Sequence, residues 1–163
     1  NCRSDTEFAG SGGYSPDPDA DCHLLVGDAS ALPAIAVALE RLAATAVGRA
    51  VVEVDDAEDE IELTAPAGVE VTWVHQRDER PGARLVDAVR SLPWPDGDLR
   101  AFVHGEAGAV KDLRTYLRTE RAMGLDRLSI SGYWRLGVDD EGWRAGKRAW
   151  NAAIESAESA ASG

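Results

Sequence analysis

The stretch HLLVGDASALPAIAVALERLA, residues 23–43, passes directly from a short apolar segment to an amphipathic one. Its first part, HLLV (23–26), has the composition of a buried strand that ends at Gly27. In the second part, ALPAIAVALERLA (31–43), leucine and isoleucine recur at helical spacing, and Ser30 stands where a helix N-cap is preferred. A strand joined to a helix by a tight glycine turn predicts the repeating unit of a parallel α/β sheet.

The rest of the chain continues this alternation. Further strands are expected at 49–54, 69–75, 100–104 and 127–132, and further helices at 83–92, 108–124 and 141–157. The alternation predicts a doubly wound α/β domain: a five-stranded parallel sheet with helices on both faces, plus a C-terminal helix. Between residues 55 and 68 an acidic stretch stands where a crossover helix is expected, so this connection is predicted to be short or irregular.

The composition fits one globular domain, because 163 residues with 44% hydrophobic content supply enough apolar surface for a core. The net charge of −12 argues against nucleic acid and an anionic membrane surface as partners, since both require a basic face. The charge is uneven: residues 50–76 contain no Lys or Arg, whereas most basic residues lie between Arg77 and Arg148. An anionic ligand is therefore expected on the second half of the chain.

Cys2 and Cys22 are too few for a disulfide framework, and with only three histidines no metal site is predicted. No signal peptide and no bilayer-spanning apolar run is visible, which predicts a cytoplasmic protein without membrane insertion. Residues 1–22 are expected to be a flexible lead-in or interdomain segment before a domain at 23–163. Because the first residue is Asn1, the chain is interpreted as part of a longer protein.

The first candidate site is the turn after the first strand, since ligands of open α/β sheets bind at the carboxyl ends of the strands. Gly27, Asp28, Ser30 and Ala31 precede a helix there, and the free N–H groups and dipole of a helix start favour a phosphate. Only one glycine of the G-x-G-x-x-G pattern is present, so an ordinary capped helix remains the alternative.

Two later loops also carry candidate ligand-binding residues. In HQRDERPG, Arg77 and Arg80 could pair with the 2′-phosphate of NADP; the alternative is two solvated arginines that balance neighbouring acids. In VHGEAGAV, Gly105 leaves the backbone open to the approach of a flat ring. Glu106 either orients an amide or favours the helix start electrostatically.

Taken together, these pieces resemble the C-terminal domain of the siderophore-interacting protein family, flavoproteins related to ferredoxin–NADP reductases. The resemblance covers about residues 13–157 and rests on PDPDADCHLLVGDASALPAIAVALE (16–40), VEVTWVHQR (69–77), AFVHGEAGAVKDLRTYLRTERAMGLDRLSISGYWRLG (101–137) and KRAWNAAIE (147–155). It implies a Rossmann-type fold that binds NADPH or NADH. Two positions depart from the family pattern: Ala29 replaces a usual Glu, and His104 replaces a usually small residue.

The resemblance also implies roles for single residues. The 27–33 turn is similar to a pyrophosphate-binding turn, with Ser30 as a hydroxyl donor. Arg77 resembles the residue near the adenosine 2′-phosphate, and Gly105 with Glu106 the turn near the nicotinamide.

The stretch SGYWRLG (131–137) is expected to face the flavin domain of the family. Tyr133 and Trp134 would lie near the flavin edge or the seam between the domains, and Arg135 would point toward an anionic ferric siderophore. The alternative for Trp134 is packing under the C-terminal helix, against Trp143 or Trp150.

The predicted function is the NAD(P)H-binding domain of a flavin-dependent ferric-siderophore reductase, which passes hydride to FAD for reduction of Fe(III) to Fe(II) and intracellular iron release. The family's flavin-binding barrel has no counterpart motif in this sequence. FAD is therefore expected only with a flavin domain in the same polypeptide or a partner chain, and this chain alone is expected to be inactive. The alternatives are a solitary, non-catalytic dinucleotide-binding or regulatory domain, and an interaction domain whose acidic segment 53–62 meets a basic partner.

Overall fold

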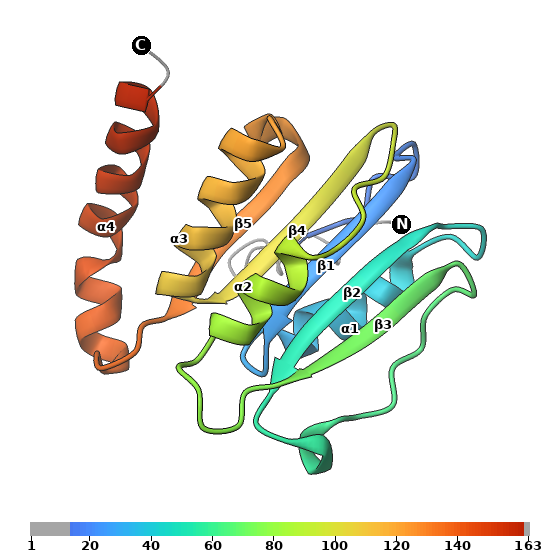
Figure 1. Ribbon diagram of the computed structural model, residues 1–163, viewed down its shortest axis with the longest axis horizontal. Coiled ribbons are helices and arrows are strands. Elements are labelled where there is room, and N and C mark those ends of the chain that lie inside the picture. Colours follow the sequence, from blue (N-terminus) through green and yellow to red (C-terminus); the bar gives the residue numbers. More distant parts are fainter. Residues whose placement is uncertain (1–13, 162–163) are drawn as a thin grey trace, which may run out of the picture.

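The computed structural model describes residues 14–161, which form one parallel sheet with helices on both faces (Figure 1). The strands are β1 (Cys22–Asp28), β2 (Gly48–Val54), β3 (Val69–His75), β4 (Leu99–Glu106) and β5 (Leu128–Trp134). Their order across the sheet is β3-β2-β1-β4-β5, and each neighbouring pair is parallel. The predicted doubly wound, five-stranded α/β fold is confirmed. Residues 1–13 of the predicted lead-in lie outside the described residues.

The four α-helices of residues 14–161 are α1 (Leu32–Arg41), α2 (Ala83–Arg90), α3 (Ala107–Thr115) and α4 (Asp140–Ala161). Figure 1 shows α2 and α3 on one face of the sheet, α1 on the other, and α4 beside α3 at the β5 edge. Between β2 and β3 the chain makes only a 3₁₀ turn, Ala57–Asp59, so the predicted irregular crossover is confirmed. No helix in the described part of the chain is both long and apolar enough to cross a membrane.

The start of α1 differs from the prediction. Ser30 is not its N-cap: the helix begins at Leu32, its N-cap is Ala31, and no side chain caps it. The reason lies one turn earlier, where the N–H and the hydroxyl of Ser30 both donate to the carboxylate of Asp28.

The end of α3 also differs from the prediction, which extended this helix to Gly124. The α-helical part ends at Thr115, and Tyr116–Glu120 continue as a π-helical turn. The chain then leaves the helix at Ala122, whose φ of 54° lies in the left-handed region. Hydrophobic spacing alone does not distinguish a π-helical turn from one more turn of α-helix.

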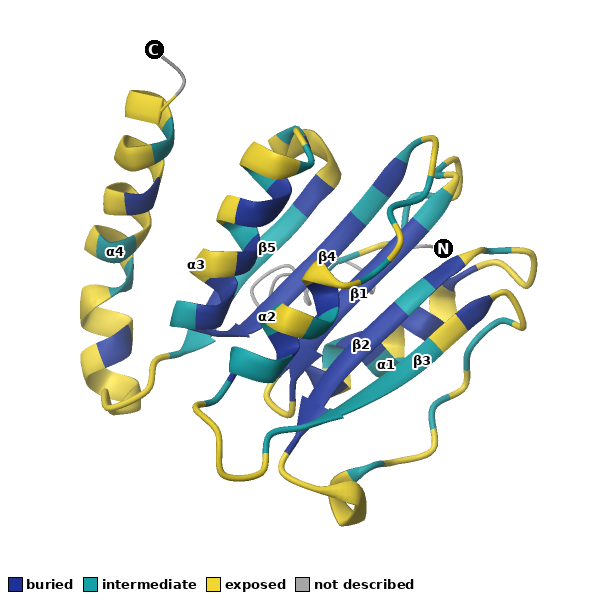
Figure 2. Cartoon of the chain, in the orientation of Figure 1, coloured by how far each residue is buried: buried dark blue, intermediate teal, exposed yellow. Residues whose placement is uncertain are grey.

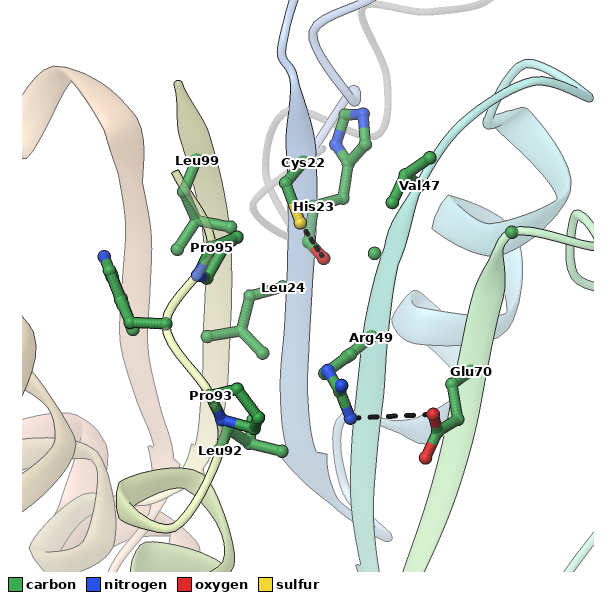
Figure 3. A pocket seen from close by; sticks show the side chains of 13 residues that line it. Cys22, His23, Leu24, Val47, Arg49, Glu70, Leu92, Pro93, Pro95 and Leu99 are labelled. Atoms are coloured by element: carbon green, nitrogen blue, oxygen red, sulfur yellow. Dashed lines mark hydrogen bonds and ion pairs between the residues drawn. The ribbon is translucent and has the colours of Figure 1, made fainter. Parts of the chain in front are cut away.

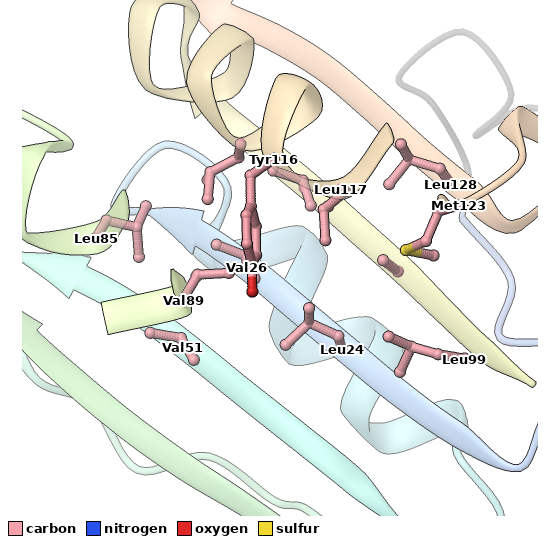
Figure 4. Packing of buried hydrophobic residues seen from close by; sticks show 13 residues of the cluster. Leu24, Val26, Val51, Leu85, Val89, Leu99, Tyr116, Leu117, Met123 and Leu128 are labelled. Atoms are coloured by element: carbon pink, nitrogen blue, oxygen red, sulfur yellow. The ribbon is translucent and has the colours of Figure 1, made fainter. Parts of the chain in front are cut away.

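Two apolar clusters lie on the two faces of the sheet. The cluster beneath α2 and α3 contains, among others, Leu24, Val26, Val51, Leu85, Val89, Tyr116 and Leu117 (Figure 4). The cluster beneath α1 contains, among others, Leu25, Ile35, Leu39, Val52 and Phe102. Successive residues of β1 alternate between the two clusters, as the two-residue period of a strand requires. Figure 2 shows β1, β2 and β4 buried along most of their length and the edge strand β3 mostly half-buried.

Candidate functional site

The strand order reverses between β1 and β4. The chain runs from β1 outward through β2 to β3, and then returns to the other side of β1 to form β4 and β5. In open parallel sheets, ligands bind at the carboxyl edge beside this switch point. Every loop of the predicted site begins at this edge, after β1, β3, β4 or β5 (Figure 1).

Asp28, at the end of β1, is only 8% exposed, and its carboxylate accepts four hydrogen bonds. Oδ1 accepts the N–H of Ser30 at 2.9 Å and the Ser30 hydroxyl. Oδ2 accepts the N–H of Glu106 and the indole N–H of Trp134, both at 2.9 Å. Both oxygens thus have protein donors, and the carboxylate connects the β1–α1 turn to the ends of β4 and β5.

The turn between β1 and α1 directs most of its donors inward. The N–H of Ala31 bonds to the Asp28 carbonyl at 3.0 Å, that of Leu32 lies 3.4 Å from the Ala29 carbonyl, and Pro33 has no N–H. The proton of the Ser30 hydroxyl is directed to Asp28. What this turn presents to a phosphate is therefore the positive end of the α1 dipole and the exposed Ser30 oxygen.

The two glycines of the predicted site face protein atoms. A Cβ at Gly27 would lie 2.7 Å from the Ala31 Cβ and 2.9 Å from the His104 carbonyl oxygen. Gly105 has a φ of +153°, and a Cβ there would lie 2.8 Å from Asp28 Oδ2. The space that the sequence suggested for a flat ring is, on the Cβ side of Gly105, filled by a carboxylate.

Glu106 is 3% exposed and bridges two segments. Its Oε2 accepts the N–H of Ala109 at 2.9 Å and so caps α3, which is the helix-start role of the two predicted for it. Its Oε1 accepts the N–H of Leu136 at 3.2 Å, in the loop after β5.

A β-bulge between β4 and β5 sets the direction of Trp134. Gly105 pairs with Gly132, but Glu106 pairs with Trp134, so the register skips Tyr133. A bulge re-aims the side chains that follow it, and here it accompanies the hydrogen bond from the Trp134 indole to Asp28. The hydrogen-bond partner of the Trp134 side chain is thus Asp28, whereas the predicted alternative was packing against Trp143 or Trp150.

The tryptophans of α4 cover the neighbouring glycine of β5 instead. The rings of Trp143 and Trp150 pack on each other with centroids 5.5 Å apart. A Cβ at Gly132 would lie 3.0 Å from the Trp143 ring and 3.2 Å from the Ala107 Cα. A glycine at this position therefore lets α4 and α3 approach β5 closely.

Three arginines at the carboxyl edge are exposed: Arg77, Arg80 and Arg135. Within residues 14–161, no carboxylate lies within ion-pair distance of any of them. Arg77 has a φ of 55°, and its N–H bonds to the carbonyl of Asp55 at 3.2 Å, so its backbone ties the loop after β3 to the loop after β2. These cations are free to meet a phosphate or another anion.

Glu53, at the end of β2, is a structural acid that sequence reasoning counted only as part of the acidic stretch. It is 3% exposed and accepts the N–H of Gly82 at 2.8 Å and that of Leu85 at 3.3 Å, at the start of α2. Burial raises the pKa of its carboxyl group above the ordinary value. The available signal was its position two residues after Val51, which places both side chains on the same face of β2.

His104 lies inside the protein, at the centre of a small group of packed side chains. It is 4% exposed, stacks on Phe102 with ring centroids 4.0 Å apart, and its Nε2 lies 3.1 Å from the hydroxyl oxygen of Ser129. Burial, reinforced by the charge of Lys147, lowers the pKa of His104 to about 4. The imidazole is therefore neutral at physiological pH.

A cavity of about 320 Å³ lies at the opposite end of the sheet (Figure 3). It is lined by residues from the amino ends of β1, β2 and β4 and by the loop Leu92–Pro93–Trp94–Pro95. The ion pair between Arg49 and Glu70, 3.6 Å apart, forms one side of it. This cavity is separate from the switch point and from every residue of the predicted site.

The topology and the position of the switch point together define a Rossmann-type α/β domain. The chain belongs to the family described as "Siderophore-interacting protein", whose sequence profile matches residues 20–137. This confirms the resemblance inferred from the motifs.

Individual relatives agree with this assignment. The chain is 49% identical over 150 residues to the Mycobacterium tuberculosis protein named "Uncharacterized protein Rv2895c", covering 84% of this chain and 52% of the relative. It is 36% identical over 133 residues to "Ferric vibriobactin reductase ViuB" of Vibrio cholerae, covering 78% and 49%. The crystal structure of a siderophore utilization protein from T. fusca matches with a TM-score of 0.70 and 39% identity, covering 78% and 49%. The chain spans about half the length of the curated relatives that it matches.

Proposed function

We propose that this chain is the NAD(P)H-binding part of a flavin-dependent ferric-siderophore reductase that acts in the cytoplasm. The observation that carries the proposal is the family match over residues 20–137, supported by 36% identity to a protein named as a ferric vibriobactin reductase. A bound nicotinamide cofactor supplies a hydride in such reductases. FAD would belong to a flavin-binding domain in the same polypeptide or in a partner chain.

The carboxyl edge fits a dinucleotide in charge and topology. The start of α1, with Gly27, Ser30 and Ala31, would lie beside the pyrophosphate, because a helix N-terminus favours an anion. Arg77 is exposed and without an ion pair in the described part, so its guanidinium can meet the adenosine 2′-phosphate of NADPH. The Gly105–Glu106 turn would lie beside the nicotinamide.

The β5 end would meet the flavin domain and the substrate. Tyr133 and Trp134 are half-buried, which leaves part of each ring available to a neighbouring domain. Arg135 is exposed, and in a protein of net charge −12 it would supply the positive charge that an anionic ferric siderophore requires.

The proposal is tested with the longest reading frame that contains this chain, and with the 163-residue chain beside it. The longer protein should carry flavin absorbance and oxidise NADPH or NADH when a ferric tricatecholate complex is added. The 163-residue chain alone should not reduce iron. A longer protein that bound NADP⁺ but neither flavin nor the ferric complex would favour the solitary nucleotide-binding alternative. A protein that bound no nucleotide would contradict both.

A further inference from the structure

Two buried carboxylates stand next to each other at the carboxyl edge, Asp28 at the end of β1 and Glu106 at the end of β4. They are 8% and 3% exposed, and the N–H of Glu106 donates to Asp28 Oδ2 at 2.9 Å. All four oxygens of the pair accept hydrogen bonds from protein groups. Neither acid has an ion pair among residues 14–161, so these donors are what stabilise the two carboxylates in their buried positions.

The donors come from segments far apart in the sequence. Asp28 holds the β1–α1 turn through the N–H of Ser30 and holds the end of β5 through the indole N–H of Trp134. Glu106 holds the start of α3 through Ala109 and the loop after β5 through the N–H of Leu136 at 3.2 Å. The pair thus connects β1, α3, β4 and β5.

Arg135 lies between the two residues that this pair holds. Trp134, on one side, is fixed by its side chain to Asp28, and Leu136, on the other side, is fixed by its backbone to Glu106. After Leu136 the chain turns back, with Gly137 at a φ of +79° and the N–H of Val138 bonded to the Arg135 carbonyl at 3.1 Å. The Arg135 side chain itself is exposed. Its backbone is therefore anchored on both sides while its guanidinium stays free.

We propose that Asp28 and Glu106 are positioning residues for Arg135. Their hydrogen bonds fix the position of the Arg135 backbone relative to the β1–α1 turn. The same two carboxylates therefore hold both the segment that would bind the anion and the turn that would bind the nucleotide. The proposal rests on the proposed function only in taking an anionic ferric complex as the ligand of Arg135. In this proposal Asp28 acts on the anion only through Arg135, since both oxygens of its carboxylate already accept hydrogen bonds from protein groups.

A positioning role and a merely stabilising role predict different results in a double-mutant cycle. If Asp28 acts through Arg135, removing the guanidinium should abolish the effect of changing Asp28 on anion binding. If Asp28 only stabilises the fold, the two changes should act independently and their effects should multiply.

The test uses the longest reading frame that contains this chain, with ferric tricatecholate as the probe and affinity measured by calorimetric titration. Arg135→Ala should weaken binding about fivefold to tenfold, the effect of one favourable charge at an exposed site. Asp28→Asn should weaken it at least about threefold, and the double variant should match Arg135→Ala within about twofold. Asp87→Asn, the same chemical change at an exposed position of α2, is the matched control and should bind as the wild type does.

A second readout keeps the test decisive if the probe binds weakly. In ¹⁵N NMR spectra, Asp28→Asn should shift the indole N–H signal of Trp134 and the amide signals of Arg135 and Leu136, and Asp87→Asn should leave them in place. Trp134→Phe, which keeps the carboxylate and removes only its indole donor, should shift the same two amides.

Each outcome bears on one claim. Unchanged signals of residues 134–136 in Asp28→Asn would overturn the positioning role, as would effects on binding that multiply in the double variant. A longer wild-type protein that carried flavin but did not bind the probe would refute the assignment of Arg135 to the ferric complex. The positioning of Arg135 would then still be decided by the NMR signals.

Discussion

His104 should make the stability of this protein depend on pH between about 4 and 6.5. Burial lowers the pKa of its imidazole from the ordinary value of 6.5 to about 4 in the folded protein. In this range the unfolded chain binds a proton at His104 that the folded protein does not bind. Stability from this residue is therefore complete above pH 6.5 and is lost as the pH falls toward 4. At about 1.4 kcal/mol per pKa unit, the loss amounts to about 3 kcal/mol.

The assay is urea unfolding followed by circular dichroism at pH 7 and pH 4.5. His104→Phe keeps a ring against Phe102 and removes the titration, so the variant should lose about 2 to 3 kcal/mol less than the wild type between the two pH values. The other buried histidine, His23, is present in both proteins, so its contribution cancels.

Equal losses of stability in the wild type and in His104→Phe would refute the reasoning. Such a result would mean that the folded protein accepts the proton without opening, for example by turning the imidazole toward water. The loss of unfolding free energy at low pH would then come from other titratable groups, and the burial of His104 would have no consequence for acid stability.

Three further results are expected. Glu53→Ala should lower the free energy of unfolding by about 2 to 4 kcal/mol in urea titrations, since it leaves two backbone N–H groups of α2 buried without an acceptor; Glu53→Gln, which keeps a carbonyl oxygen, should lose less. Gly105→Ala should lower Tm by several degrees, because its φ and a carboxylate oxygen 2.8 Å away both oppose a Cβ, whereas Gly146→Ala in the open part of α4 should not lower it. Arg77→Ala should weaken NADP⁺ binding about tenfold and NAD⁺ binding less than about twofold, measured by titration; equal losses would remove Arg77 from the 2′-phosphate.

The sheet could be predicted from the sequence because short segments rich in apolar and β-branched residues alternate with segments of helical periodicity. The prediction for β3 coincides with the observed strand, Val69–His75. The absence of a crossover helix between β2 and β3 was predicted from the acidic composition of residues 55–68. The ends of helices were harder to predict from the sequence, because they depend on which hydrogen-bond partner a side chain meets in the folded protein. Ser30 has the chemistry of an N-cap, yet it bonds to a carboxylate that the strand has brought beside it.

The candidate site was predicted in its location but not in its internal connections. The rule that ligands bind at carboxyl ends of strands selected the right loops. No local pattern reveals that Asp28 accepts from Glu106 and Trp134, which lie 78 and 106 positions away in the sequence. The bulge that aims Trp134 also depends on the pairing of two strands, so it has no signature within either one.

The long separation between Asp28 and its donors also bears on how the protein is made. Asp28 leaves the ribosome before its Trp134 donor, which is added 106 residues later. The central strand β1 likewise lacks its neighbour β4 until β2 and β3 have been synthesised. Until then the carboxylate has no complete set of donors, and burying it is unfavourable. A nascent chain that stops before β5 should therefore remain open at this edge, and the finished edge should form late in synthesis, after the β1–β2–β3 half has come together.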